Sequence, residues 1–452
     1  MPPVIHRFAS AARAAPASRR PRTARLVRHL AAFAAGAAWC GVAPAQLVEV
    51  GPFSLSGFVK GEIGWGSNVC DDCQREPGED RHRLWADDLA YGRKYGTEFT
   101  HGWLFQPTLN ARFNLGGGYR LTGTLSQRYR DGSIDFPGFW YDRSVTLSHE
   151  DYGALQVGAF VLRTWGFADF PYATDIGMSP VFSDSGAGYG LAKKALRYTS
   201  RLYDVAEGDL LFEVTWDRGD TRFKVHKPRL LEYWVHYGRR DLRLELLIQD
   251  TRNGRPSAFS HGPFSSLTSD PADDAKLGKS SQSVVMLLGK YRVNAQYEAS
   301  GGIRFNRWSG AYAVPTSGNL WNAMFNVHWG GFDNSPQPVA NPGYPARTTD
   351  VMLGVRRFDG PWASHVGMTY LSEARTSNPL ERGQSNSAWY GSVGTRYDLR
   401  NGLQLYGSLN AVVYGRKGLA PLSLPSHSAF SNVDSRVANQ GNWITLGAIY
   451  NF

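Results

Sequence analysis

The residues best suited to do chemistry are two cysteines separated by two residues, in the sequence Cys70-Asp-Asp-Cys73. This spacing occurs in redox motifs and also supplies half of a zinc site. The other half of a zinc site would come from His82 or His101, and neither stands at a standard spacing. In an oxidising compartment a disulfide within a loop is favoured over metal binding and over free thiols. We therefore expect a disulfide between Cys70 and Cys73, no metal site and no cofactor.

Catalytic side chains are present but form no recognisable constellation. Serine precedes histidine at Ser260-His261 and at Ser426-His427, yet both residue types are abundant in the polar segments, so such pairs arise by chance. The sequence carries no nucleophile elbow, metal-ligand cluster or phosphate-binding loop. We expect a protein that is not an enzyme.

The N-terminal segment explains most of the charge. The chain has a formal net charge of +10, but residues 1–45 contain seven arginines and no acidic residue, which leaves +3 for the rest. A nearly balanced remainder without a basic stripe argues against a nucleic-acid partner. The basic segment, the apolar residues 30–42 and then Ala43-Pro-Ala45 have the layout of a secretory signal peptide. Sec export is favoured over the twin-arginine route because no apolar run follows Arg19-Arg20. We expect residues 1–45 to be cleaved and residues 46–452 to form one domain.

Composition and periodicity favour β-structure. Of the 452 residues, 42% are hydrophobic and 13% aromatic, which is too much for a disordered chain. Beyond the N-terminal segment no run of about 20 apolar residues exists, so a helical membrane bundle is excluded. From Phe53 onward the pattern has period two: Val59 and Ile63 alternate with Lys60 and Glu62. This alternation predicts strands.

The spacing of the strands predicts a transmembrane barrel. Short turns rich in Gly, Asp and Asn alternate with long polar connections, and aromatic residues stand at strand ends, as in barrels with short turns at one rim and two aromatic girdles. The stretch Asn319 to Trp329 is also strand-like, but single-chain bacterial barrels have even strand counts, so we assign it to an ordered loop. We expect sixteen antiparallel strands near 53–65, 103–115, 119–130, 140–148, 153–161, 194–200, 209–216, 229–237, 241–249, 282–291, 295–307, 348–358, 362–372, 387–397, 402–414 and 443–452.

Four segments carry a resemblance to a known family. The C-terminal Trp443-Ile-Thr-Leu-Gly-Ala-Ile-Tyr-Asn-Phe452 resembles the closing strand of Gram-negative outer-membrane barrels. Residues 53–59 resemble the first strand of general porins, and residues 153–159 resemble the strand that leads into their third loop. The paired segments 351–358 and 362–370 resemble their late hairpins. The chain thus resembles the general porin family in its β-proteobacterial style, although the glycine-rich acidic motif common in the third loop is missing.

The resemblance implies a function and a set of partners. It implies an outer-membrane porin, a homotrimer in contact with membrane lipid and lipopolysaccharide, through which small hydrophilic solutes and ions diffuse passively. Tyr450 and Phe452 would then form the assembly signal. It also implies that the third extracellular loop folds inward, bringing Asp169, Asp175 and Asp184 to the constriction.

The alternation of the strands places a basic set on the lumen side. An acidic loop opposite arginines would create a transverse field that selects ions by sign. The alternative function is a substrate-specific channel, for example for a sugar or an organic anion, or a surface-binding barrel. The aromatic stretches Trp321 to Trp329 and Trp165 to Tyr172 favour this alternative. The expected basic wall consists of Lys60, Arg112, Arg128, Arg130, Arg197, Arg243 and Arg356.

Overall fold

The structure is a computed structural model of the whole chain. It describes residues 48–66, 98–134, 141–168, 186–188, 190–218, 227, 229–252, 280–310, 345–376, 383, 385, 387–399, 402–416, 421, 423 and 439–452. The expected signal peptide, the Cys70–Cys73 pair, the three third-loop aspartates and the stretch Asn319 to Trp329 lie outside the described residues. In the described part of the chain, no helix is long and apolar enough to cross a membrane.

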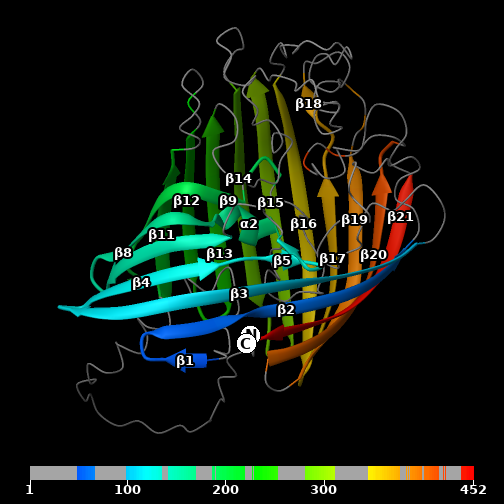
Figure 1. Cartoon of the computed structure of the whole chain (residues 1–452). Coiled ribbons are helices and arrows are strands. Elements are labelled where there is room, and N and C mark those ends of the chain that lie inside the picture. The colour runs from blue at the N-terminus through cyan, green and yellow to red at the C-terminus, as the bar shows by residue number, and fades with distance from the viewer. Residues whose placement is uncertain are drawn as a thin grey trace, which may run out of the picture.

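The fold is a closed antiparallel barrel of sixteen long strands, as expected (Figure 1). Each strand pairs with its neighbour in the chain, and the first pairs with the last. The long strands are β2 (Phe53–Gly66), β3 (Glu98–Gly116), β4 (Tyr119–Ser126), β7 (Asp142–His149), β8 (Gly153–Val161), β9 (Leu191–Thr199), β11 (Gly208–Asp217), β12 (Arg229–Gly238), β13 (Leu242–Arg252), β14 (Ser280–Arg292), β15 (Tyr297–Gly310), β16 (Ala346–Asp359), β17 (Trp362–Leu371), β19 (Ala388–Asp398), β20 (Leu403–Tyr414) and β21 (Gln440–Asn451).

Five short strands extend this sheet: β1 (Val48–Val50), β5 (Tyr129–Arg130), β6 (Ser133–Ile134), β10 (Tyr203–Val205) and β18 (Arg375–Thr376). One of them corrects the expected strand 119–130, which is divided into β4 and β5. Both β4 and β5 pair with β3. The register continues across the break, which lies opposite Pro107 of β3: the N–H of Gln127 donates to Pro107 O at 3.4 Å, but Pro107 has no N–H to donate in return. The side chain of Arg128, beside the break, donates from Nε to Gln106 Oε1 and from Nη2 to Tyr141 Oη, both at 2.8 Å.

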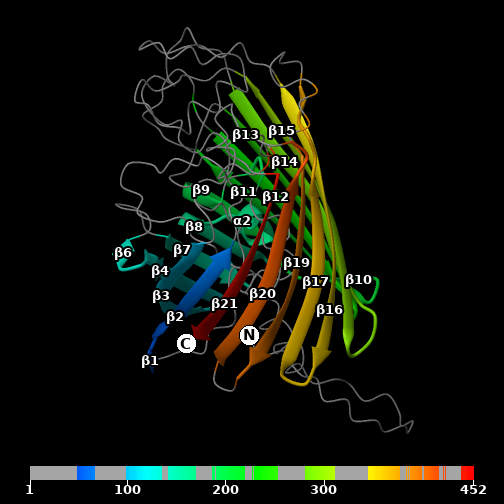
Figure 2. The ribbon, with the colours of Figure 1, turned by 90° about the vertical axis from the view of Figure 1, so that its right-hand side faces the viewer.

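The barrel closes between β2 and β21 (Figures 1 and 2). The register runs from Phe58 opposite Asn451 to Gly66 opposite Trp443. Backbone bonds between Gly57 and Phe452, at 2.8 and 3.0 Å, extend the pairing to the last residue. A Cβ at Gly57 would collide with the carbonyl oxygen of Gln106 on β3, so the closing seam requires glycine there.

The strands are apolar outside and mostly polar inside. On β20, Leu405 and Leu409 point outward and are 44% and 53% exposed, whereas Gln404 and Ser408 are buried inside. This is the alternation of a membrane barrel. Aromatic pairs stand at both ends of the outer face: Trp362 meets Tyr397 near the short turns, and Tyr370 meets Trp389 near the long connections, with ring centroids 4.7 and 4.6 Å apart. These pairs match the expected girdles.

Candidate pore constriction

A short helix after β8 lies inside the barrel. Helix α2 (Arg163–Ala168) begins two residues beyond the end of β8 and is surrounded by the strands in both views (Figures 1 and 2). Together with residues 186–188 it forms the described part of the third long connection, which we call the inward segment. The expected inward-folded third loop is therefore present.

Glu232 of β12 holds the beginning of the helix. Its carboxylate accepts the backbone N–H groups of Arg163, at 2.9 Å, and of Thr164, at 3.3 Å. Gln249 of β13 donates to Glu232 at 2.8 Å and to Thr164 Oγ1 at 3.1 Å. A carboxylate here satisfies backbone donors that have no partner within the helix. A lumen-facing glutamate thus attaches the inward segment to the wall.

A second anchor runs through Glu213 of β11. The guanidinium of Arg163 forms an ion pair with Glu213 and lies 4.3 Å from the ring centroid of Trp234. Arg197 of β9 stands between the two glutamates, 4.0 Å from Glu213 and 3.7 Å from Glu232. Charges therefore alternate along this wall, with each buried carboxylate facing an arginine.

Two separate connections converge on β15 and β16. The backbone N–H of Ala187 in the inward segment donates to Asn306 Oδ1 at 2.9 Å. Asn306 Nδ2 donates to Asp350 Oδ2 at 2.7 Å, and Arg304 pairs with the same oxygen at 2.8 Å. Ser423, from the connection between β20 and β21, donates to the other carboxylate oxygen at 3.1 Å. The fully buried Asp350 is therefore a hub that joins both connections to the wall.

Apolar side chains inside the barrel support the inward segment. Phe167 of α2 is fully buried, and its ring centroid lies 6.4 Å from that of Trp234. On β14, Val284, Met286 and Leu288 face the lumen and are buried in the same cluster. The expectation of a polar interior is thus incomplete, because the wall beneath the inward segment is apolar. The unbroken apolar run from Val284 to Leu288 was the sequence signal for this docking surface.

Several of the expected basic residues are neutralised by partners on the wall. Lys60 pairs with Glu62 at 3.0 Å. Arg243 pairs with Glu245 and Arg356 with Glu298, both at 2.7 Å. Arg197 stands between Glu213 and Glu232 in a row of alternating charges, which we call the buried ladder. The acidic residues expected at the constriction all belong to the third loop, so pairing of the basic residues with carboxylates of the wall itself was not predicted. The alternation of each strand also places these carboxylates on the lumen side, and that is the sequence signal that could have identified them.

Two of the expected basic residues have no carboxylate partner among the described residues. Arg128 bonds to neutral groups, with its guanidinium carbon 4.1 Å from the ring centroid of Tyr141 and 5.8 Å from that of Trp165 in α2. Arg112 lies exposed near the short turn that ends β3. Arg130 stands opposite Leu104, on the lumen side. That Arg112, Arg128 and Arg130 face the third-loop aspartates stays a prediction.

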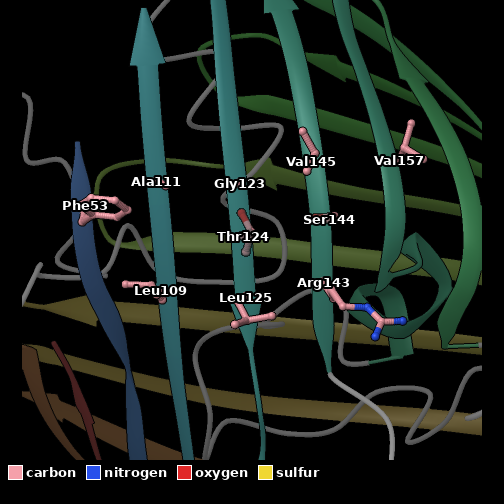
Figure 3. A pocket seen from close by; sticks show the side chains of 10 residues that line it. All are labelled: Phe53, Leu109, Ala111, Gly123, Thr124, Leu125, Arg143, Ser144, Val145 and Val157. Carbon is pink, nitrogen blue, oxygen red and sulfur yellow. The ribbon is translucent and has the colours of Figure 1, made fainter.

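One hollow of about 310 Å³ lies on the outer face of the barrel (Figure 3). It lies over Ala111, which has only a methyl side chain, and Gly123, which has none. It is bordered by the apolar side chains of Leu109, Leu125 and Val157 and by one outward-facing arginine, Arg143. Its lining residues are Phe53, Leu109, Ala111, Gly123, Thr124, Leu125, Arg143, Ser144, Val145 and Val157. In the described part of the chain no group of three or more His, Cys, Asp or Glu could hold a metal ion.

Comparison with known proteins gives the fold. No protein-family model matches the sequence, and no curated protein matches it. The anion-selective porin from Comamonas acidovorans is similar in structure, with a TM-score of 0.56 and 13% identity over 88% of this chain and 99% of that one. The outer-membrane protein OmpT of Vibrio cholerae gives 0.52 and 12%, over 90% and 99%. Salmonella typhi OmpF, in complex with daunomycin, gives 0.50 and 11%, over 90% and 100%. The chain has the fold of the Gram-negative outer-membrane porins.

Proposed function

We propose that the protein is an outer-membrane porin, a water-filled channel through which small hydrophilic solutes and ions diffuse passively. The observation that carries this proposal is a sixteen-strand barrel, polar along most of its lumen, with a connection held inside it by the buried ladder Glu213, Arg197 and Glu232. A barrel of sixteen strands leaves room for an aqueous lumen. A narrowing segment on a charged wall is what a channel needs to sort solutes, and it provides no reaction chemistry.

The proposal includes the setting of the channel. The apolar outer face and its aromatic ends support a location in the outer membrane, in contact with lipid and lipopolysaccharide. Export requires the cleaved signal peptide expected at residues 1–45, with Tyr450 and Phe452 as the assembly signal. The hollow on β4, β7 and β8 supports a homotrimer, because another subunit could cover Arg143 on this otherwise apolar face. One OmpT structure from Vibrio cholerae is described as a trimer form.

A second function, a substrate-specific sugar channel, has its own observation. Tyr390 and Trp443 stack inside the barrel with ring centroids 5.8 Å apart, and Tyr390 donates to Asn410 Oδ1 at 2.8 Å. Trp443 Nε1 and the neighbouring Thr445 Oγ1 are buried without a hydrogen-bond partner among the described residues. Aromatic faces beside unused polar atoms suit a sugar, which has apolar faces and hydroxyl edges; because Tyr390 and Trp443 are only 1% and 2% exposed, binding requires the side chains that cover them to move.

Swelling of proteoliposomes separates the two functions. Liposomes containing the purified protein are placed in isotonic solutions of sugars of increasing size. Passive diffusion predicts swelling rates that rise linearly with sugar concentration and fall smoothly with sugar size. Saturation by one sugar, removed by Trp443→Ala but not by Trp389→Ala on the outer face, would favour the specific channel. No swelling with any sugar or salt would contradict both.

A further inference from the structure

A row of three arginines crosses the outer face of the barrel. Arg307 of β15 stands directly opposite Arg347 of β16, and Arg347 directly opposite Arg375 of β18. All three are exposed. Their chain neighbours Asn306, Ala346 and Ala374 are buried inside, so alternation directs the arginines outward. We call Arg307, Arg347 and Arg375 the outer arginine row.

No acidic side chain that the structure describes forms an ion pair with this row. Directly opposed residues on neighbouring strands lie about 5 Å apart, and like charges at that separation destabilise a sheet. Among the described residues, none of the three arginines has an ion pair or a side-chain hydrogen bond. Because such a row costs stability in the bare protein, it indicates an anionic partner.

The row lies at the height of one membrane surface. On β16 the outward apolar residues Val351, Leu353 and Val355 lie between Arg347 and Arg357. Ten residues of strand measure about 34 Å, and a tilt of about 40° reduces this to a height of about 26 Å, close to the apolar band of about 25 Å in membrane barrels. Arg357 stands at the end with the short turn, where it pairs with Asp359 at 3.3 Å. The row stands at the opposite end, which is the outer-leaflet side if short turns face the periplasm.

We propose that the outer arginine row binds the phosphate groups of a phosphorylated glycolipid in the outer leaflet. Guanidinium groups bind phosphate with two parallel charge-assisted hydrogen bonds, and three in a row suit a headgroup with more than one phosphate. The acyl chains would lie over Phe305, Val351 and Leu353, which are exposed directly below the row. This inference rests on the proposed outer-membrane location, and it names the residues that contact the lipid.

The test uses the full-length mature protein in detergent, with bisphosphorylated lipid A as the probe and native mass spectrometry as the measurement. The variant Arg307→Gln/Arg347→Gln/Arg375→Gln removes the row, and Arg357→Gln is the matched control at the other rim. We expect the triple variant to bind lipid A about tenfold more weakly or worse, and the control to bind like the wild type. Equal binding by the triple variant and the wild type would overturn the proposal.

Two further arms identify the source of the phosphate and the role of the row. Inorganic phosphate at the same concentration should not displace lipid A, and displacement would show a site for free anions instead. Oligomer size in glycolipid-free detergent should be the same for the triple variant and the wild type, since loss of the oligomer would make the row a subunit contact. If the triple variant does not fold, Arg347→Gln alone, at the centre of the row, should still bind lipid A about threefold more weakly.

The channel function is measured separately. Single-channel conductance in phospholipid bilayers without glycolipid should be the same for the triple variant and the wild type, because the row faces away from the lumen. If the protein conducts ions but does not bind lipid A, the lipid site is refuted and the channel function stands. If the protein binds lipid A but does not conduct ions, the channel function is refuted and the lipid site stands.

Discussion

Replacing Glu232 with alanine should release the inward segment from the wall. Glu232 accepts two backbone N–H groups of α2 and the side chain of Gln249, and it faces Arg197 at 3.7 Å. Removing one partner of a buried charge pair costs about 3 to 5 kcal/mol, since the remaining charge is left without compensation. If most of this cost falls on the docked state, the ratio of docked to released segment falls by about two to three and a half orders of magnitude.

The assay is single-channel recording in planar bilayers. We expect Glu232→Ala to give noisier open channels, with brief transitions between conductance levels as the segment leaves and returns. Asp209→Ala is the matched control, because Asp209 is an exposed acid near the short-turn end of β11. Heat modifiability of both variants checks that the barrels fold. If Glu232→Ala folds and its current traces match those of the wild type in mean, noise and gating, then Glu232 does not hold a segment that narrows the channel.

Three further predictions address the wall, the closing strand and the charge of the lumen. Leu409→Arg on the lipid side should reduce assembly, because Leu409 stands opposite Val393, midway between the two aromatic ends, and an arginine at the membrane midplane costs about 2 to 4 kcal/mol. Gln404→Arg, inside the barrel, should be tolerated because Asp398 stands directly opposite; equal outer-membrane levels of the two variants would mean that the facing is wrong. Deleting Phe452, which packs with Phe105 and Tyr450 and closes the seam at Gly57, should lower the amount of folded barrel in outer-membrane fractions, and unchanged amounts would contradict its role. Replacing Arg112, Arg128 and Arg130 with serine should shift the reversal potential toward cations, more strongly in 0.1 M salt than in 1 M because the Debye length falls from about 10 Å to about 3 Å; an unchanged potential in dilute KCl would place these arginines away from the constriction.

The strands could be predicted because alternation is a local property of the sequence. Each expected strand has its counterpart, including the closing strand that ends at Phe452. The division of the expected strand 119–130 was not predicted, because it depends on the neighbouring strand: Pro107 of β3 stands opposite Gln127 and lacks the N–H that would complete the ladder.

The contacts that hold the inward segment could be predicted less well from the alternation of strand residues. Lys60 and Arg197 are both buried inside the barrel. The partner of Lys60, Glu62, lies two residues further along the same strand, whereas the partners of Arg197, Glu213 and Glu232, come from two other strands. Alternation within one strand does not say which other strands contribute partners.

The hub at Asp350 joins residues that are 44 to 73 positions away in sequence. Arg304 and Asn306 reach Asp350 because β15 pairs with β16, with Arg304 directly opposite Asp350, whereas Ser423 comes from the connection between β20 and β21.

Charge balance sets the expected selectivity. Many lumen-facing arginines have a carboxylate beside them, as in the pairs Arg304–Asp350 and Arg396–Asp398, at 2.8 and 2.7 Å. Paired charges produce a weaker net potential than a purely basic wall. The unpaired cations Arg112 and Arg128 leave a small positive excess among the described residues. We therefore expect a mild preference for anions.

The most direct test of the channel is the conductance of the purified wild-type protein in a planar lipid bilayer. The structure predicts stepwise, long-lived increases in current, with a conductance that rises with the conductivity of the bathing salt and a reversal potential slightly toward that of the anion in a KCl gradient. If the heat-modifiable, folded protein inserts into the bilayer and gives no such steps at any salt concentration, the barrel is not an open channel.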